Sequence, residues 1–128
     1  MELDLLASPL AIIRLAPSEL MPEWTAAARV FLSVTRTAHE LSIVADVTAV
    51  PTALQTAVTY RAFRVRGPLQ HNLVGVFSAL ATPLALAGIP IFPIATFDTD
   101  YLLVGVPDID AAVHALSAAG HHVMHRDA

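Results

Sequence analysis

Two carboxylates, Asp98 and Asp100, are the only charged side chains between Arg66 and Val104. They lie in the short polar segment 96–100, which follows a long apolar stretch of the chain. A carboxylate in this setting can pair with an ammonium group or a basic side chain of a ligand. The alternative is structural, because aspartate commonly stabilises a turn between two strands. If the protein has a site, we expect it between this turn and the start of the helix that precedes it.

A second group of residues with chemical potential lies near the C-terminus, where His121, His122 and His125 invite a metal-binding interpretation. Adjacent histidines on a strand point to opposite faces, so they do not converge on one ion. The chain has no cysteine, which excludes thiolate-ligated zinc, thiol catalysis and disulfides. We therefore expect no metal site.

The remaining polar residues do not form a catalytic constellation. Ser42, Ser78 and Ser117 lack the glycine-rich turn that exposes a nucleophilic serine. Asp110 and His114, four residues apart, are typical of a solvated pair on a helix face. No acid, base and oxyanion site come together, so we expect no enzyme, no catalytic residue and no cofactor.

Composition narrows the class of protein further. The chain has 128 residues, of which 55% are hydrophobic and 14% are charged, with a net charge of -4. No basic cluster is present, so a nucleic-acid partner is not expected. The N-terminal segment 1–4 is acidic where a secretory signal would be basic, which favours a cytoplasmic location. The uncharged stretch 73–97 is long enough to cross a bilayer, but its prolines and glycines favour a helix, a turn and a strand, and no membrane association is expected.

The second half of the sequence predicts the order strand, helix, strand, strand, helix, strand. The predicted strands cover residues 60–66, 89–96, 99–106 and 122–125, and the predicted helices cover 70–87 and 108–119. The first helix carries an apolar stripe of Leu73, Val76, Phe77, Leu80 and Leu84. Right-handed crossovers turn this order into a ferredoxin-like α+β sheet with two helices on one face. Its second strand contains Pro90 and Pro93 and therefore belongs at an edge or at a bulge.

The first half predicts a shortened version of the same pattern. Strands are expected at 10–15, 31–37 and 41–46, with a brief helical turn after the first of them. The segment 47–59 suits either a short helix or a linker between the halves. Residues 31–44 parallel residues 92–104, which is consistent with a faint internal repeat. If the repeat is real, the two halves pack as a pseudo-dimer.

The segments GPLQHNLVGVFSALATPLAL (67–86) and AGIPIFPIATFDTDYLLV (87–104), with ELSIV at 40–44, resemble ACT domains of amino-acid-sensing regulators. The pattern is similar to aspartokinase-type ACT domains and to small tandem ACT proteins related to the arginine sensor CASTOR. The resemblance implies a degenerate ACT-like βαββ half at 1–58 and a βαββαβ ACT domain at 59–128. Where the family would have an acidic residue followed by an aromatic one, this chain has Gln70 and His71.

The resemblance implies binding of a free amino acid at an interface between ACT units. Backbone N–H groups at the start of the first predicted helix would receive the ligand's carboxylate, helped by the helix dipole. The backbone before the second predicted strand and the carboxylates of the polar turn would supply the remaining contacts. The candidate ligand-binding residues are Leu69, Gln70, His71, Asn72, Ile89, Pro90, Ile91, Phe92, Thr96, Asp98, Thr99 and Asp100. His71 is equally compatible with a simple helix cap.

Two functions of different classes fit these observations. The first is a non-enzymatic regulatory protein that senses a free amino acid, whose identity the sequence does not give. The second is an interaction module that keeps the ACT fold without a ligand and associates with itself as a homodimer or with a partner protein. The unusual Gln70 and His71 favour the second function, and the intact segments 88–92 and 96–101 favour the first.

Overall fold

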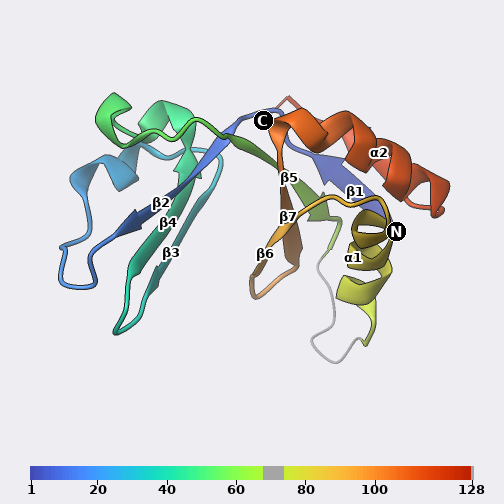
Figure 1. The fold of residues 1–128 in the computed structure, drawn as a ribbon, viewed down its shortest axis with the longest axis horizontal. Coiled ribbons are helices and arrows are strands. Elements are labelled where there is room, and N and C mark those ends of the chain that lie inside the picture. Colours follow the sequence, from blue (N-terminus) through green and yellow to red (C-terminus); the bar gives the residue numbers. More distant parts are fainter. Residues whose placement is uncertain (68–73, 128) are drawn as a thin grey trace. The chain divides into compact units, whose positions relative to one another are not determined.

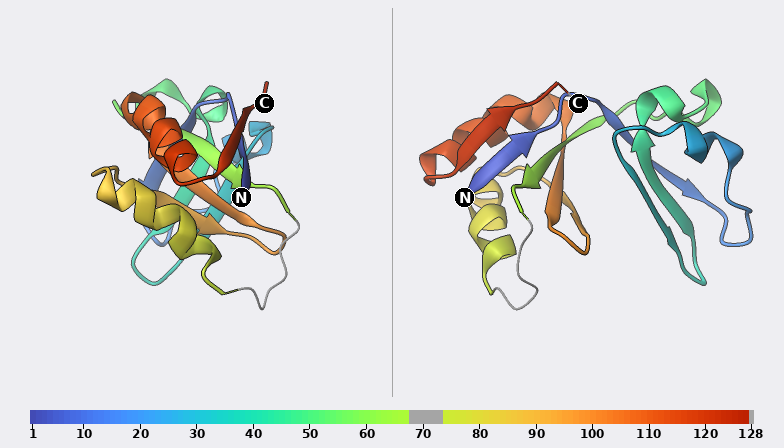
Figure 2. Two further views of the ribbon diagram at one scale, coloured as in Figure 1. Left: turned by 90° about the vertical axis from the view of Figure 1, so that its right-hand side faces the viewer. Right: turned by 180° about the vertical axis from the view of Figure 1, so that it is seen from behind.

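The computed structural model of the chain describes residues 1–67 and 74–127. It contains two compact units. The smaller unit is Ser8–Tyr60, and the larger unit joins Met1–Ala7 to Arg61–Asp127. Figures 1 and 2 show the strands and helices of each.

The smaller unit is an antiparallel sheet in the order β3-β4-β2. Its strands are β2 (Leu10–Leu15), β3 (Leu32–Arg36) and β4 (Leu41–Asp46), and its 3-10 helices are η1 (Glu23–Ala27), η2 (Val47–Ala49) and η3 (Thr52–Leu54). The predicted order of strand, helical turn, strand and strand is confirmed. The central strand β4 places Leu41, Ile43 and Ala45 in a core that also contains Ile13, and Trp24 packs against it. The segment 47–59, for which a short helix and a linker were both possible, contains the two short helices η2 and η3.

The larger unit is a five-stranded sheet with two α-helices on one face (Figures 1 and 2). The order of its strands is β6-β7-β5-β1-β8. The strands are β1 (Glu2–Leu5), β5 (Tyr60–Val65), β6 (Phe92–Ala95), β7 (Asp100–Gly105) and β8 (His122–His125); the helices are α1 (Val76–Leu86), α2 (Ile109–Ala118) and the 3-10 helix η4 (Val106–Asp108). The prediction of a ferredoxin-like α+β fold is confirmed. Strand β6, which contains Pro93, lies at a sheet edge, where the missing N–H of proline is tolerated. Pro90, predicted to belong to this strand, precedes it.

Strand β1 was not predicted. In the expected order, the last strand would lie beside the first strand of the pattern, but β1 separates β8 from β5. It pairs antiparallel with β5 and parallel with β8. Its Leu3 and Leu5 are fully buried in the core, while Glu2 and Asp4 lie on the other face of the sheet.

Helix α1 is shorter than predicted, because it begins at Val76 instead of residue 70. Gly75 precedes it with a φ of 82°, a left-handed conformation that glycine adopts readily. Leu80 and Leu84 are fully buried, as the apolar stripe predicts. Phe77, assigned to the same stripe, is 45% exposed, so that assignment was wrong. Leu73 lies outside the described residues.

Pro83 lies inside α1 without ending it. A proline has no N–H, so the carbonyl of Ala79, four residues earlier, loses its usual helical donor. The ring nitrogen Nε2 of His121 lies 3.0 Å from that carbonyl oxygen, and its Nδ1 lies 2.9 Å from the Met1 amino group. With Nδ1 accepting, Nε2 carries the proton and donates to the carbonyl. The expected weakness in α1 is therefore relieved by a side chain from after α2.

Helix α2 agrees closely with its prediction. Ile109, Ala112 and Leu116 are buried against the sheet, and Gly120 follows the helix with a φ of 93°. Asp108 occupies the N-cap position, although its side chain makes no capping hydrogen bond. Within 1–67 and 74–127, no helix has the length and apolar character needed to cross a bilayer.

Candidate functional site

The turn between β6 and β7 is held closed by Thr96. Its N–H and its Oγ1 both donate to the carbonyl oxygen of Thr99, at 2.9 and 2.8 Å. The N–H of Thr99 donates back to Oγ1 of Thr96 at 3.2 Å. This reciprocal pattern leaves Phe97 and Asp98 at the tip of the turn, both exposed, with Phe97 at 80%. The turn therefore presents its aromatic and acidic side chains on a rigid base.

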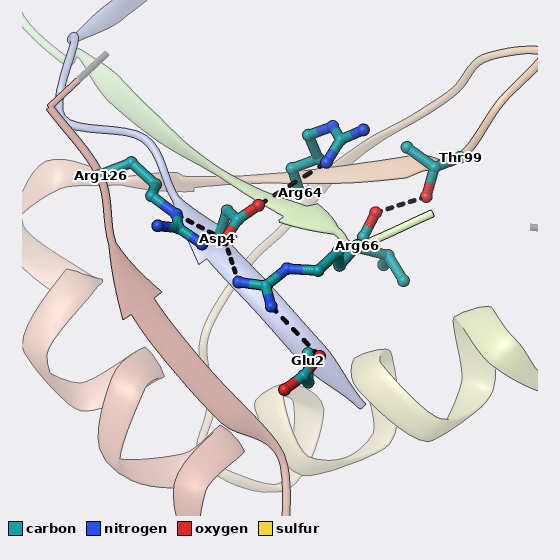
Figure 3. Close-up of polar contacts among 7 residues, drawn as sticks. Glu2, Asp4, Arg64, Arg66, Thr99 and Arg126 are labelled. Atoms are coloured by element: carbon teal, nitrogen blue, oxygen red, sulfur yellow. Dashed lines mark hydrogen bonds and ion pairs between the residues drawn. The ribbon is translucent and has the colours of Figure 1, made fainter. Parts of the chain in front are cut away.

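The same turn is fastened to the end of β5. Thr99 is buried, and its Oγ1 donates to the carbonyl oxygen of Val65 at 2.7 Å (Figure 3). Val65 is the last residue of β5, and Arg66 and Gly67 lead from it toward the predicted ligand-binding segment 69–72. The turn, which is part of the predicted site, is thus bonded directly to the end of β5, which the sequence analysis did not include in the site.

The structure describes only some of the other predicted site residues. Leu69, Gln70, His71 and Asn72 lie outside the described residues. Asp100 is half-buried and begins β7, paired with Ala95.

The stretch before β6 offers little free backbone. The Ile89 N–H already donates to the carbonyl of Leu84 at 2.9 Å, and Pro90 is exposed but has no N–H. Ile91 packs against the core, and Phe92 is half-buried in β6, opposite Leu103. Side-chain surface is available here, but two of the four residues cannot donate a backbone hydrogen bond to a ligand.

The start of α1 has the electrostatic character expected of an anion site. Its N-cap is Gly75, which has no side chain to cap the first N–H groups, and no acidic residue lies in its first turn. The positive end of the helix dipole is therefore not neutralised by a carboxylate of the helix itself. This end of α1 follows the predicted ligand-binding segment in the sequence.

A charged cluster that sequence reasoning missed lies on the sheet face opposite the helices (Figure 3). Asp4 of β1 is the centre of this Asp4 cluster. Its carboxylate oxygens lie 2.9 Å from Nη2 of Arg66, 2.8 Å from Nε of Arg126 and 3.6 Å from Nη1 of Arg64. Arg66 also contacts Glu2 at 3.2 Å. The signal in the sequence was the alternation of arginines at the end of β5, whose acidic partner 62 positions away could not be identified locally.

Opposing effects act on the ionisation of Asp4. Burial on its own raises the pKa of the carboxyl, but hydrogen bonds from Arg66 and Arg126, with attraction to both guanidinium groups, outweigh burial. The pKa of Asp4 therefore lies below its ordinary value of 3.8. The hydrogen bond to Asp4 likewise raises the pKa of Arg66. Asp4 is a permanent anion at neutral pH, and Arg66 is engaged by two carboxylates.

The C-terminal histidines do not form a metal centre in the described part of the chain, where no three histidine or acidic side chains lie together in a metal-binding arrangement. His121 is engaged with Ala79 and Met1 instead.

Two family models match the sequence. A model of the ACT domain matches residues 55–118, and a model of an N-terminal domain matches residues 9–53. The two matches correspond closely to the larger and smaller units.

Several solved structures are also similar to this chain. A protein of Agobacterium tumefaciens is 33% identical to this chain, with a TM-score of 0.87, covering 99% of this chain and 94% of its own. A Vibrio cholerae protein of unknown function, described as a possible transport protein, is 20% identical with a TM-score of 0.74 over 92% of this chain and 88% of its own. The aspartate kinase of Clostridium acetobutylicum is 12% identical with a TM-score of 0.62, covering 88% of this chain but 33% of the kinase. The Vibrio cholerae protein and the kinase share the fold with this chain. Because the ACT-domain model matches residues 55–118, half of the sequence, the chain belongs to the ACT-domain family.

Proposed function

We propose that the chain is a non-enzymatic regulatory protein whose ACT domain binds a free amino acid beside the end of β5. The observation that carries the proposal is the hydrogen bond from Thr99 to the Val65 carbonyl. It fixes the turn with Asp98 next to the strand that leads into the β5–α1 connection. An amino acid is a zwitterion, so its site needs an anion-binding element and a carboxylate, and we propose the β5–α1 connection and Asp98 for these two roles.

Each charge of the ligand has a proposed partner. The α-carboxylate is received by backbone N–H groups at the β5–α1 connection, where the start of α1 contributes its dipole. The ammonium group, or a basic side chain, pairs with Asp98, which is exposed and makes no hydrogen bond or ion pair within the described residues. Arg66 is not available for the carboxylate, because Asp4 and Glu2 already hold it.

A similar order of strands in the two units supports the proposal of a site formed between ACT units. The hairpin β3–β4 pairs Arg36 with Leu41 as the hairpin β6–β7 pairs Ala95 with Asp100. In chain order, the five-residue helix η1 lies between β2 and β3, as α1 lies between β5 and β6. We propose that the predicted degenerate half, 1–58, and the ACT domain, 59–128, are related in this way, and that the ligand binds where ACT surfaces meet, within one chain or between two.

Thermal unfolding against a panel of the twenty amino acids at millimolar concentration tests the proposal. A ligand present at about 100 times its dissociation constant stabilises the native state by about 2.7 kcal/mol, which raises the midpoint by several degrees. A rise with one amino acid, or with one chemical class, supports the sensor. A panel without any shift contradicts it at millimolar affinity.

A pair of variants then locates the site. Asp98→Asn removes the proposed charge partner and keeps the size of the side chain, so the ligand-dependent shift should fall strongly. Asp110→Asn, at an exposed carboxylate in the first turn of α2, is the matched control and should keep the full shift. Equal shifts in both variants would remove Asp98 from the site while leaving the sensor in place.

The second candidate function is a ligand-free interaction module. The departure from the family pattern at Gln70 and His71 favours it. It predicts a flat panel together with association of the chain with itself or with another protein. Analytical ultracentrifugation with and without each amino acid separates the two functions, because a sensor changes its association or stability with ligand and a simple module does not.

A further inference from the structure

Strand β1 pairs with a neighbouring strand on each side, as a separate peptide would if it bound between two strands of a sheet. On one side it pairs antiparallel with β5, with Leu3 opposite Val65 and Leu5 opposite Phe63. On the other side it pairs parallel with β8 over the whole of its length, from Glu2 to Leu5. It fills the slot between β5 and β8, where its Leu3 and Leu5 are fully buried.

Backbone hydrogen bonds extend the pairing beyond both ends of the strand. The N–H of Arg66 donates to the Glu2 carbonyl at 3.0 Å, and the N–H of Leu6 donates to the Ala62 carbonyl at 2.9 Å. On the β8 side, the N–H of Arg126 donates to the Leu5 carbonyl at 2.9 Å. Such ladders give affinity for any strand, without regard to its sequence.

The side chains of β1 supply specificity. Leu3 and Leu5 are fully buried in the core of the larger unit. On the opposite face, Asp4 meets three arginines, one within β5, one just after it and one beyond β8. The slot therefore selects a strand that alternates acidic and apolar residues, and the segment Glu2–Leu5 has that alternation.

The connection between β1 and the next element is short. Leu6 is still bonded to the larger unit, whereas the carbonyl of Pro9 accepts the N–H of Val47 in the smaller unit at 3.0 Å. Only Ala7 and Ser8 lie between them, and a short hinge next to a proline is a setting that favours exchange of an element between copies. The elements β5, α1, β6, β7, α2 and β8 already have the ferredoxin-like order, so β1 is an addition to that pattern.

We propose that the slot between β5 and β8 is a strand-binding site whose second occupant is β1 of another copy of this chain, so that two copies associate by reciprocal exchange of Glu2–Leu5. Exchange preserves every contact of β1, since the same residues meet in the same register. The ratio of exchanged dimer to closed monomer therefore depends on the chain concentration and on the conformation that the hinge prefers. The proposal does not depend on amino-acid binding.

Single cysteines at paired positions test the exchange, because the chain has no cysteine of its own. Glu2 and His122 are direct partners across β1 and β8, and both are exposed. Chains carrying Glu2→Cys and chains carrying His122→Cys are mixed in urea, refolded together at high concentration and oxidised mildly. The exchanged form brings the two cysteines together, so mixed dimers should exceed the share that random collision produces.

The control pair is Thr35→Cys with Ser42→Cys, direct partners across β3 and β4 whose strands are joined by a tight turn. This mixture should give the random share of mixed dimers. An equal share for both pairs overturns the proposal. Wild-type chains of light and heavy isotope composition, refolded together, provide a second measurement without any substitution. Native mass spectrometry should show dimers of mixed mass, and a spectrum with monomers alone overturns the proposal as well.

Discussion

Replacing Asp46 by alanine should destabilise the smaller unit more than any other removal of a single acid in it. The carboxylate of Asp46 is buried at the end of β4 and accepts three backbone hydrogen bonds. The N–H groups of Arg29 and Val30 donate to Oδ2 at 2.7 and 2.8 Å, and that of Phe31 donates to Oδ1 at 2.8 Å. These bonds hold the chain that enters β3 against the strand beside it.

The size of the effect follows from the burial of the three donors. A hydrogen bond to a charged group contributes about 1.5–3 kcal/mol, so three such bonds set an upper bound of about 4.5–9 kcal/mol. The donors at Arg29 and Val30 are partly buried, and water can replace the carboxylate there. The donor at Phe31 is buried and would lose this acceptor. We expect a loss of about 3–5 kcal/mol, a large part of the stability of a typical domain.

Urea unfolding with two probes measures this loss. Trp24 is the only tryptophan and packs against the core of the smaller unit, so its fluorescence follows that unit. Circular dichroism at 222 nm follows α1 and α2, which belong to the larger unit. Asp46→Ala should lower the midpoint of the Trp24 transition, whereas Glu19→Ala, at an exposed acid of the same unit, should change the free energy of unfolding by no more than about 0.5 kcal/mol.

Replacement of Asp46 by asparagine would not be conservative either. In Asp46→Asn one oxygen becomes an NH₂ group, which cannot accept a hydrogen bond from the backbone donors it faces. The variant should therefore lose nearly as much stability as Asp46→Ala. If both variants unfold within about 1 kcal/mol of the wild type, the carboxylate is not what holds the entry to β3, and the reasoning from its three hydrogen bonds is refuted.

Three further substitutions test the larger unit by denaturant unfolding. Because the pKa of Asp4 is depressed, its stabilising effect is complete above the ordinary pKa of 3.8 and disappears as the pH falls through the lower folded-state value. The difference in the free energy of unfolding between wild type and Asp4→Asn should therefore shrink as the pH is lowered below 3.8, and a constant difference would contradict this. Thr99→Val removes the donor to the end of β5 and should cost about 1–2 kcal/mol, against a negligible effect of Thr35→Val on exposed β3. His121→Ala should lower the free energy of unfolding by about 0.5–1 kcal/mol. The loss should be smaller in a Pro83→Ala background, because residue 83 then has an N–H that can donate to the Ala79 carbonyl. Equal losses in both backgrounds would show that His121 does not replace that donor.

Elements with complete local signals were the ones predicted well. Helix α2 has an apolar stripe at three- and four-residue steps, an aspartate before it and Gly120 after it. Each signal acts within a few residues, so no knowledge of the fold was needed. The edge position of β6 followed in the same way from Pro93, since a proline restricts where a strand can lie whatever its partner is.

Elements that depend on distant partners were missed or misplaced. Strand β1 has four residues, and what makes it a strand is the slot between β5 and β8. Its acidic residues indicate only a charged N-terminal segment when they are considered alone. The start of α1 was predicted too early because Gly75 was treated as part of an apolar run, although glycine weakens a helix interior and suits its boundary.

The candidate site shows the same division between local and distant information. The polar turn before β7 was recognisable from its residue types. Its attachment to β5 was not, because the hydroxyl of Thr99 bonds a carbonyl 34 residues earlier. This attachment also changes the role of Thr99, whose hydroxyl is buried within the protein and serves to position the turn.

The use of the acidic side chains bears directly on where a ligand can bind. Asp4 and Asp46 are both buried. Asp4 pairs with three arginines and Asp46 accepts three backbone hydrogen bonds, so neither can turn to a ligand without loss of stability. Asp98 is exposed, lies on a turn held by Thr96 and Thr99, and engages no other described residue. Pairing with an ammonium group at Asp98 would therefore break no interaction with residues 1–67 or 74–127. Because the turn is already rigid, binding would also carry little cost in ordering it. Its exposure and the hydrogen bonds that hold its turn make Asp98 the carboxylate to test first.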